Sequence, residues 1–331
     1  MKKISLTGIK PTGHPHIGNL FGMIQPAIEL TKAYDAYYFI ADYHALNAIK
    51  DPQVLKALTY EVAATWLACG LEPKKINIYK QSDIPEIFEL ETLLAAFIPK
   101  GLMNRAHAYK AMVDKNTETG KHPDDGVNMG LFTYPILMAA DILIFDSDVV
   151  PIGKDQLQHL EMTIDIAESV NANYKKEIIK VPKALLNEET QYITGLDGRK
   201  MSKSYGNGIE IFLPEKELKN KIMHIVTNSQ SIEEKKDPTQ CTIFSLYKLF
   251  ATMGEQKQLA SRYESGGMGW GEAKKELFSV ANRFLSPLRE KYEYYINNKS
   301  IIDQILITGA KKVRVKAQEK IRFLRREIGI L

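Results

Sequence analysis

The stretch Ile4-Ser5-Leu6-Thr7-Gly8-Ile9-Lys10-Pro11-Thr12-Gly13-His14-Pro15-His16-Ile17-Gly18-Asn19 decides the fold of this chain. Its first residues, 4–8, form a short apolar run typical of a strand, and a helical pattern begins near Ile17 after a loop of prolines and glycines. A strand that passes through such a loop into a helix is the unit of a parallel sheet, and the helix N-terminus can hold a nucleotide phosphate. The stretch therefore predicts a nucleotide-binding α/β domain.

The same alternation continues through about residue 182. Residues 36–41 are short, aromatic and uninterrupted, as expected of a strand buried on both faces, and Asp51-Pro52 is typical of a helix start. We therefore predict a doubly wound parallel sheet, a Rossmann-like α/β domain over residues 1–205. The expected strands are 4–8, 36–40, 76–80 and 149–152, and the expected helices are 17–32, 52–69, 85–97, 133–144 and 155–170.

The polar stretch 114–125 interrupts this pattern and predicts a mobile loop within residues 100–130. Beyond Phe212 no strand pattern remains, and we predict a smaller all-helical domain over residues 206–300. Residues 301–331 form a last segment with a helix at 303–328, whose apolar stripe requires a packing partner such as the first domain.

That last segment is also basic. It holds eight Lys/Arg and three Asp/Glu, a net charge of +5, while the whole chain carries +4, so the first 300 residues sum to −1. Such a segment favours a polyanionic partner, for which Lys312, Lys316, Arg322 and Arg326 are candidates, although a solvated helix face is the more frequent explanation.

Composition limits the class of protein. The chain is 44% hydrophobic and 25% charged, as in ordinary globular proteins, and its two cysteines lack the CxxC spacing of a structural zinc or iron–sulfur site. The N-terminal apolar run is too short for a signal peptide, and the longest apolar stretch, 131–145, is too short to span a bilayer. We expect a cytoplasmic protein without membrane contact.

A second motif, Lys200-Met201-Ser202-Lys203-Ser204, lies far downstream. Its two ammonium groups can follow the β- and γ-phosphates of a nucleotide as negative charge moves onto a leaving group, together with Mg²⁺. A solvated basic turn is the alternative, since most lysines are exposed. The rarity of a fixed pentapeptide favours phosphate binding.

In this order the two motifs resemble the signatures of class I aminoacyl-tRNA synthetases, and the residues between them resemble the tryptophanyl branch. The resemblance extends from residue 2 to about 212, and loosely to the end. It implies that the chain activates L-tryptophan with ATP and Mg²⁺, releases pyrophosphate and transfers the aminoacyl group to tRNA(Trp). It also implies a homodimer, no DNA partner and no metal held by protein side chains.

The reaction requires alignment of the reactants and stabilisation of charge on phosphoryl oxygens, for which Thr12, His16 and Asn19 are suitable donors. Glycines and prolines could equally form only a turn. The family usually has histidine at position 19, though its tryptophanyl branch commonly has asparagine; Lys10 and Lys154 also depart from the usual residues. The expected catalytic residues are Thr12, His16, Asn19, Lys200 and Lys203, and the expected ATP-binding residues are Lys10, Pro11, Thr12, Gly18, Asn19, Gly153, Lys154, Asp155, Ile193, Lys200, Met201, Ser202, Lys203 and Ser204.

The segment Gly153-Lys154-Asp155-Gln156 follows a predicted strand. A carboxylate at the carboxyl end of such a strand can accept from ribose hydroxyls, although Asp155 could be only the N-cap of the next helix. The resemblance assigns the ribose to Gly153 and Asp155, and the amino acid's ammonium or carboxylate to Gln156.

Asp141 lies inside an otherwise apolar helix, where a carboxylate is costly to bury without a donor. An indole N–H is a suitable donor; a lysine or a backbone group is the alternative partner. In the resembling family the aspartate of this segment binds the indole nitrogen. The expected tryptophan-binding residues are Asp141, Met138, Tyr134, His44, Gln156, Leu6, Val150 and Ile152.

Three rival functions remain: a tyrosyl-tRNA synthetase, a non-catalytic paralogue that senses tryptophan or binds RNA, and a small-molecule adenylyltransferase. A tyrosyl enzyme needs further polar groups for the phenol, for which Tyr43, His44 and Tyr134 are candidates. The homodimer could form through Leu90, Leu94, Phe97 and Ile98, unless this stripe is plain core.

Overall fold

The structure is a computed structural model that describes residues 2–11, 13–153, 156–186, 193–202 and 205–331. Its five-stranded sheet has the order β3-β2-β1-β4-β5, and every pairing is parallel. From β1 the chain adds strands on one side (β2, β3) and then on the other (β4, β5), so the strand order reverses between β1 and β4. Doubly wound sheets bind ligands at this point. The predicted fold class is confirmed. The strands are β1 (Ile4–Ile9), β2 (Asp35–Ile40), β3 (Asn77–Lys80), β4 (Val149–Ile152) and β5 (Lys183–Leu186).

Both faces of the sheet are covered, and β2 shows why. Its alternate side chains enter two different cores: Tyr38 and Ile40 pack with α4, while Tyr37 and Phe39 pack with α5 and α8. This explains the unbroken apolar run expected of a doubly buried strand. The helices of this domain are α1 (Ile17–Asn19), a π-helical turn (Leu20–Ile24), α2 (Gln25–Leu30), α3 (Asp42–Ala45), α4 (Pro52–Ala68), a 3-10 turn (Gln81–Asp83), α5 (Glu86–Ala95), α6 (Lys100–Met103), α7 (His107–Glu118), α8 (Met129–Leu143) and α9 (Leu157–Tyr174).

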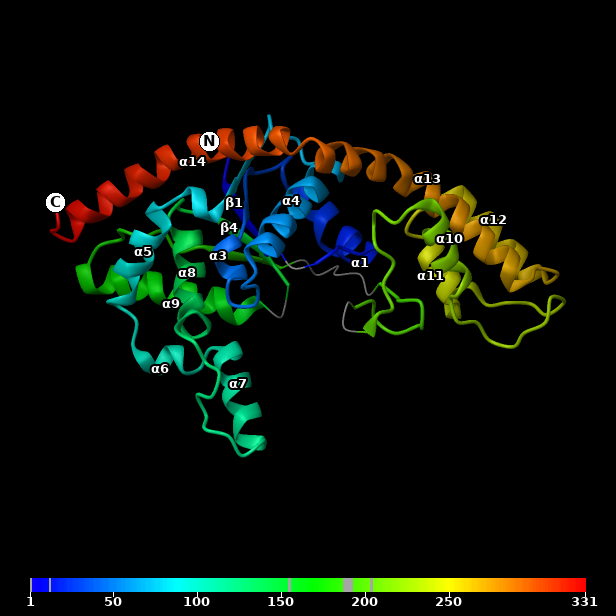
Figure 1. The fold of residues 1–331 in the computed structure, drawn as a ribbon, viewed down its shortest axis with the longest axis horizontal. Coiled ribbons are helices and arrows are strands. Elements are labelled where there is room, and N and C mark those ends of the chain that lie inside the picture. Colours follow the sequence, from blue (N-terminus) through cyan, green and yellow to red (C-terminus); the bar gives the residue numbers. More distant parts are fainter. Residues whose placement is uncertain (1, 12, 154–155, 187–192, 203–204) are drawn as a thin grey trace.

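Two sequence expectations need correction here. Residues 107–118 form helix α7, which projects away from the sheet with α6 (Figure 1), so the predicted loop begins only after Glu118. The Asn116 amide stabilises the turn that follows by donating to the carbonyls of Pro123 (2.9 Å) and Asp125 (2.8 Å). Leu90 and Leu94 are buried in the core, so for them the stripe is plain core rather than a dimer surface.

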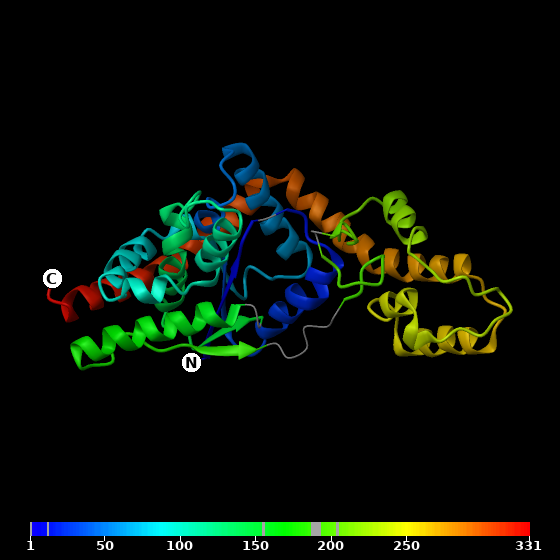
Figure 2. The ribbon, with the colours of Figure 1, turned by 90° about the horizontal axis from the view of Figure 1, so that it is seen from below.

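Residues 205–331 contain helices and no strand. Four helices and a short 3-10 turn gather around a core that includes Ile243, Tyr263 and Leu277. They lie at one end of the molecule (Figures 1 and 2). These elements are α10 (Glu215–Met223), the turn at Pro238–Gln240, α11 (Thr242–Tyr247), α12 (Met253–Ser265) and α13 (Trp270–Asn297). Among the described residues, no helix has the length and apolar character needed to cross a membrane.

Helix α14 (Lys299–Glu327) continues the line of α13 back across the molecule (Figure 1). Ile302 and Leu306 belong to the core on one side of the sheet, whereas Val313 and Ile321 belong to the core on the other side. The helix therefore crosses the edge of β3. Covering an edge strand in this way prevents its unpaired backbone groups from pairing with another chain.

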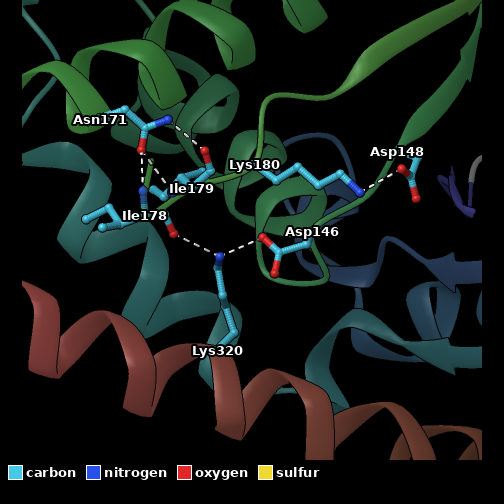
Figure 3. Close-up of polar contacts among 7 residues, drawn as sticks. All are labelled: Asp146, Asp148, Asn171, Ile178, Ile179, Lys180 and Lys320. Carbon is cyan, nitrogen blue, oxygen red and sulfur yellow. Dashed lines mark hydrogen bonds and ion pairs between the residues drawn. The ribbon is translucent and has the colours of Figure 1, made fainter. Parts of the chain in front are cut away.

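Four of the eight basic residues in 301–331 are paired within the chain. Lys320 Nζ, which is buried, donates to Asp146 Oδ1 (2.6 Å) and to the Ile178 carbonyl (3.0 Å), as Figure 3 shows. Beside it, the Asn171 side chain holds the backbone of Ile178 and Ile179. Three further pairs join α14 to the domain: Arg314–Glu86, Arg325–Glu89 and Lys316–Asp35. The basic segment thus owes much of its composition to intramolecular pairing.

The crossing point provides a stability test. A Cβ added at Gly309 would lie 1.8 Å from the Ile78 carbonyl oxygen, a backbone atom that cannot move aside. We expect Gly309→Ala to lower the free energy of unfolding by about 2–3 kcal/mol, as overpacking does, although alanine normally favours a helix. Gly271→Ala is the matched control in α13, because an added Cβ there meets no described atom within 4 Å. Chemical unfolding of both variants measures the difference; a Gly309→Ala protein as stable as the parent would contradict the close crossing.

Candidate active site

The two signature motifs lie together at the carboxyl end of β1. Ile17 N donates to the Ile209 carbonyl (2.8 Å), Ile211 N donates to the Pro15 carbonyl (3.1 Å), and His16 forms an antiparallel bridge with Glu210. Residues just after the second motif are thereby paired with the first. This contact is long-range, and the sequence alone did not predict it.

His16 caps helix α1. Its Nδ1 accepts from Asn19 N (3.2 Å), and Asn19 Oδ1 accepts in return from His16 N (3.0 Å), which completes a capping box. Asparagine at position 19 thus supplies an acceptor to the backbone through Oδ1. Gly18 lies against this ring, since a Cβ there would be 2.8 Å from His16 Nδ1 and 3.5 Å from Met201 Sδ. Lys10 is exposed, Pro11 is buried, and Thr12 lies outside the described residues.

The described part of the second motif is held by hydrogen bonds. Met201 N donates to the Ile193 carbonyl (2.8 Å), and Ser202 N donates to Asn207 Oδ1 (2.9 Å). The Lys200 side chain is exposed, whereas Met201 is buried. Lys203 and Ser204 lie outside the described residues. The loop therefore presents Lys200 to solvent on an ordered backbone.

Sequence reasoning missed Asn207. Its amide Nδ2 donates to Asp197 Oδ1 (2.7 Å) and to the Lys200 carbonyl (3.1 Å), and the residue is only 4% exposed. The hydrogen bond from Asn207, followed by those from Arg199, holds the pKa of Asp197 at about 2. The only signal for Asn207 in the sequence is that it is a polar residue three positions after the pentapeptide.

Gln156 and Tyr134 are joined through His159. His159 Nδ1 donates to Gln156 Oε1 (3.2 Å), and this tautomer leaves Nε2 to accept from the Tyr134 hydroxyl. Burial raises the pKa of Tyr134 to about 12, so its hydroxyl remains a donor. His159 could have been identified from the sequence by its position three residues after Gln156, in the first turn of helix α9. Gly153 directly follows β4, while Lys154 and Asp155 lie outside the described residues.

Asp141 is 1% exposed and has two side-chain partners. Gln81 Nε2 donates to Oδ1 (2.9 Å) and Oδ2 (3.0 Å), and His44 Nε2 lies 2.9 Å from Oδ2. Burial raises the pKa of this carboxyl, while the hydrogen bonds from His44 and Gln81 oppose the shift. The partners are thus neither a lysine nor a backbone group. Gln81 was missed, although a polar residue directly after the strand at 76–80 was a usable signal.

A carboxylate offers about four lone-pair sites, so these three contacts leave capacity for one more N–H. Apolar side chains surround this region: Leu6, Val150 and Ile152 are buried in the core that holds the neighbours of Asp141 on α8, and Met138 packs against it. The structure thus places the spare acceptor capacity of a buried carboxylate beside an apolar core, with the buried Gln81 Oε1 as a further acceptor. Such a combination suits a flat apolar ring that carries a single donor.

Comparison with known proteins agrees with this geometry. The family described as tRNA synthetases class I (W and Y) matches residues 2–286. A tryptophan–tRNA ligase of Bordetella pertussis is 49% identical over 328 residues, which cover 98% of this chain and 72% of that protein; one of Pseudomonas putida is 47% identical and covers 98% and 73%. A crystal structure of tryptophanyl-tRNA synthetase from Campylobacter jejuni, complexed with ADP and tryptophan, matches with a TM-score of 0.91 and 44% identity over 98% of this chain and 99% of that one.

The chain therefore belongs to the class I tRNA synthetases for tryptophan and tyrosine. Within that family it belongs to the tryptophanyl branch, the tryptophan–tRNA ligases, and it is an enzyme that uses ATP as a substrate. A tyrosyl-tRNA synthetase from Archaeoglobus fulgidus shares the fold at 18% identity and a TM-score of 0.61. The tyrosyl alternative is not favoured.

Proposed function

We propose that this site joins the carboxylate of L-tryptophan to the α-phosphate of ATP, with Mg²⁺, and passes the aminoacyl group to the terminal adenosine of tRNA(Trp). One observation carries the proposal: the candidate residues follow the carboxyl ends of four adjacent strands. The first motif follows β1, His44 follows β2, Gln81 follows β3 and Gly153 follows β4. Ligands of doubly wound sheets bind at this edge.

The nucleotide would lie against the two paired motifs. His16, Asn19 and the amide of Gly18 would bind the phosphates at the start of α1. Lys10, Pro11 and Thr12 would lie before them, and Gly153, Lys154 and Asp155 would bind near the ribose. Lys200, Lys203 and the backbone of the second motif would stabilise the departing pyrophosphate. The remaining contacts assigned to ATP are Ile193, Met201, Ser202 and Ser204.

Tryptophan would lie with its indole N–H on Asp141, against Met138, Leu6, Val150 and Ile152. The Gln156–His159–Tyr134 chain would then receive the ammonium or carboxylate. His44 would keep the Asp141 carboxylate oriented. This arrangement discriminates by a single hydrogen bond and by shape.

Mg²⁺ fits this site as a companion of ATP. Mg²⁺ beside a nucleotide is usually held by the substrate phosphates and water, with few or no protein ligands, and we propose the same here. When bound, it would neutralise charge on the phosphates. The protein's own contribution is the alignment of Lys200 and the helix N-terminus.

The same proposal includes a cytoplasmic homodimer in which residues 1–205 catalyse activation and residues 206–300 bind the tRNA anticodon region. A contribution of the basic helix to tRNA binding is limited by the pairing of Lys316 with Asp35 (3.6 Å). Lys312, Arg322 and Arg326 remain exposed and available for phosphates.

Amino-acid-dependent ATP–pyrophosphate exchange, screened across the twenty amino acids, tests this function. We expect tryptophan to stimulate exchange at least about a hundredfold more than tyrosine or phenylalanine, because the pocket offers one buried acceptor to a donor-only ring. Equal stimulation by tyrosine would contradict the assignment of the pocket. No exchange with any amino acid would contradict the activity itself.

A further inference from the structure

We propose that Asn207 is a positioning residue that couples the second signature loop to the first and so places Lys200 for the activation step. The inference rests on the proposed function, because it concerns the rate of that reaction. It adds a residue outside both motifs. Two sets of contacts, one on each side of Asn207 along the chain, support it.

On one side, the Asn207 side chain closes the loop on itself. It bonds the two backbone groups that bracket Met201, accepting from Ser202 N (2.9 Å) and donating to the Lys200 carbonyl (3.1 Å), and it also donates to Asp197 Oδ1 (2.7 Å). The contact is close packed: a Cβ added at Gly195 would lie 2.4 Å from Asn207 Nδ2. One buried amide therefore fixes the backbone that carries Lys200.

On the other side, the residues directly after Asn207 are paired with the first motif. The Ile209 carbonyl accepts from Ile17 N, and Glu210 forms an antiparallel backbone β-bridge with His16. Lys221 Nζ holds this segment in place through the Gly208 carbonyl (3.1 Å) and Glu210 (2.5 Å). The backbone of residues 207–211 is thus bound to both motifs at once.

These contacts connect the Lys200 backbone, through residues 207–211, to the start of α1. Misplacing a catalytic group by about 1 Å can lower a rate roughly a hundredfold without changing which substrates bind. Loss of Asn207 should therefore reduce the rate of activation while tryptophan, which is held elsewhere, binds normally. A residue that only stabilised the fold would not show this separation.

The variant Asn207→Asp gives a signature of its own. Its carboxylate still accepts from Ser202 N but places a second negative charge beside Asp197 and removes the donor to Lys200. Two carboxylates at this distance share a proton, which raises the pKa of one of them, and the protonated form can donate again. The charged group in contact with this pair is Arg199, on Asp197; the next charged groups along the chain are Glu210, which pairs with Lys221, and the His16 ring, which lies against Gly208. Because these other groups also titrate, the rate of Asn207→Asp is expressed relative to the wild-type rate at the same pH.

The experiment measures kcat and KM for ATP in pyrophosphate exchange, tryptophan affinity and thermal stability in the full-length protein. The variants are Asn207→Ala, Asn207→Asp and the exchanged pair Asp197→Asn with Asn207→Asp. Asn171→Ala is the matched control, because Asn171 also makes three hydrogen bonds to loop backbone, at residues 178 and 179.

We expect Asn207→Ala to lower kcat about ten- to a hundredfold with tryptophan affinity within about twofold, and Asn171→Ala to leave kcat unchanged. The relative rate of Asn207→Asp should recover as pH falls from about 8 to about 5.5, and the exchanged pair should recover part of the rate without that pH dependence. Wild-type kcat in Asn207→Ala, or a loss matched by Asn171→Ala, would overturn the inference. So would a loss that neither acid nor the exchanged pair restores. Absence of exchange in the wild type would instead overturn the proposed function, and this inference with it.

Discussion

Replacing Lys200 with alanine is expected to lower the rate of tryptophan activation by about a hundredfold. Charge develops on the departing pyrophosphate in the transition state, so an ammonium placed there stabilises the transition state more than the bound substrates. Removing one such electrostatic donor costs about 3 kcal/mol, which corresponds to a factor of about 100 in rate. Because the Lys200 side chain is exposed, the substitution should hardly change folding stability.

Single-turnover formation of the adenylate measures this effect, with tryptophan affinity determined separately. Lys216→Ala is a suitable control, because Lys216 is also exposed but lies on α10. The sequence predicts the same behaviour for Lys203, which lies outside the described residues. A Lys200→Ala enzyme with a rate within about twofold of the wild type would remove Lys200 from the catalytic set.

Replacing Asp141 with alanine is expected to weaken tryptophan binding about ten- to a hundredfold. A hydrogen bond to a charged acceptor is worth roughly 1.5–3 kcal/mol, and without it the indole N–H would be buried unpaired. The substitution also leaves Gln81 and His44 without their acceptor, so part of the loss would come from local rearrangement. Asp141→Asn keeps the shape but presents an amide to these two donors, and it should show an intermediate affinity.

Tryptophan affinity by equilibrium binding and the KM for ATP together check this expectation. The KM for ATP should stay within about twofold of the wild-type value in both variants, because the residues assigned to ATP lie in the other motifs. Unchanged tryptophan affinity in Asp141→Ala would make the carboxylate purely structural.

The sheet could be predicted because its signals are local. The run at 36–41 has apolar side chains for both faces, and the Asp51-Pro52 pair gives α4 its N-cap, with Asp51 accepting from Gln53 N and Val54 N. Strand β5 could not be predicted in this way. Three of its four residues are exposed at the edge of the sheet, so it lacks the apolar pattern of its neighbours. Helix α7 was missed for a similar reason, since it is largely polar and projects from the body.

The site could be predicted only at the level of motifs. The motifs named His16, Asp141 and Lys200 because spacing and residue type carry the signal. Gln81 contacts Asp141, His159 contacts Tyr134 and Asn207 contacts the backbone of the second motif. These contacts form only when segments distant in the sequence meet, apart from that of Asn207, which is five to seven residues away. Of the four basic residues of α14 that the sequence suggested for an external partner, Lys316 pairs with Asp35 inside the molecule, a contact that a charge pattern alone does not show.

The most direct test of the account compares tryptophan with its benzothiophenyl-alanine analogue, in which sulfur replaces the indole N–H, in the wild type and in Asp141→Ala. The affinities of both ligands for both proteins form a cycle that isolates the N–H to carboxylate hydrogen bond. We predict that the wild type binds tryptophan about ten- to a hundredfold more tightly than the analogue, and that the difference falls to within about threefold in Asp141→Ala. An equal deficit of the analogue in both proteins would contradict the proposed basis for selecting tryptophan.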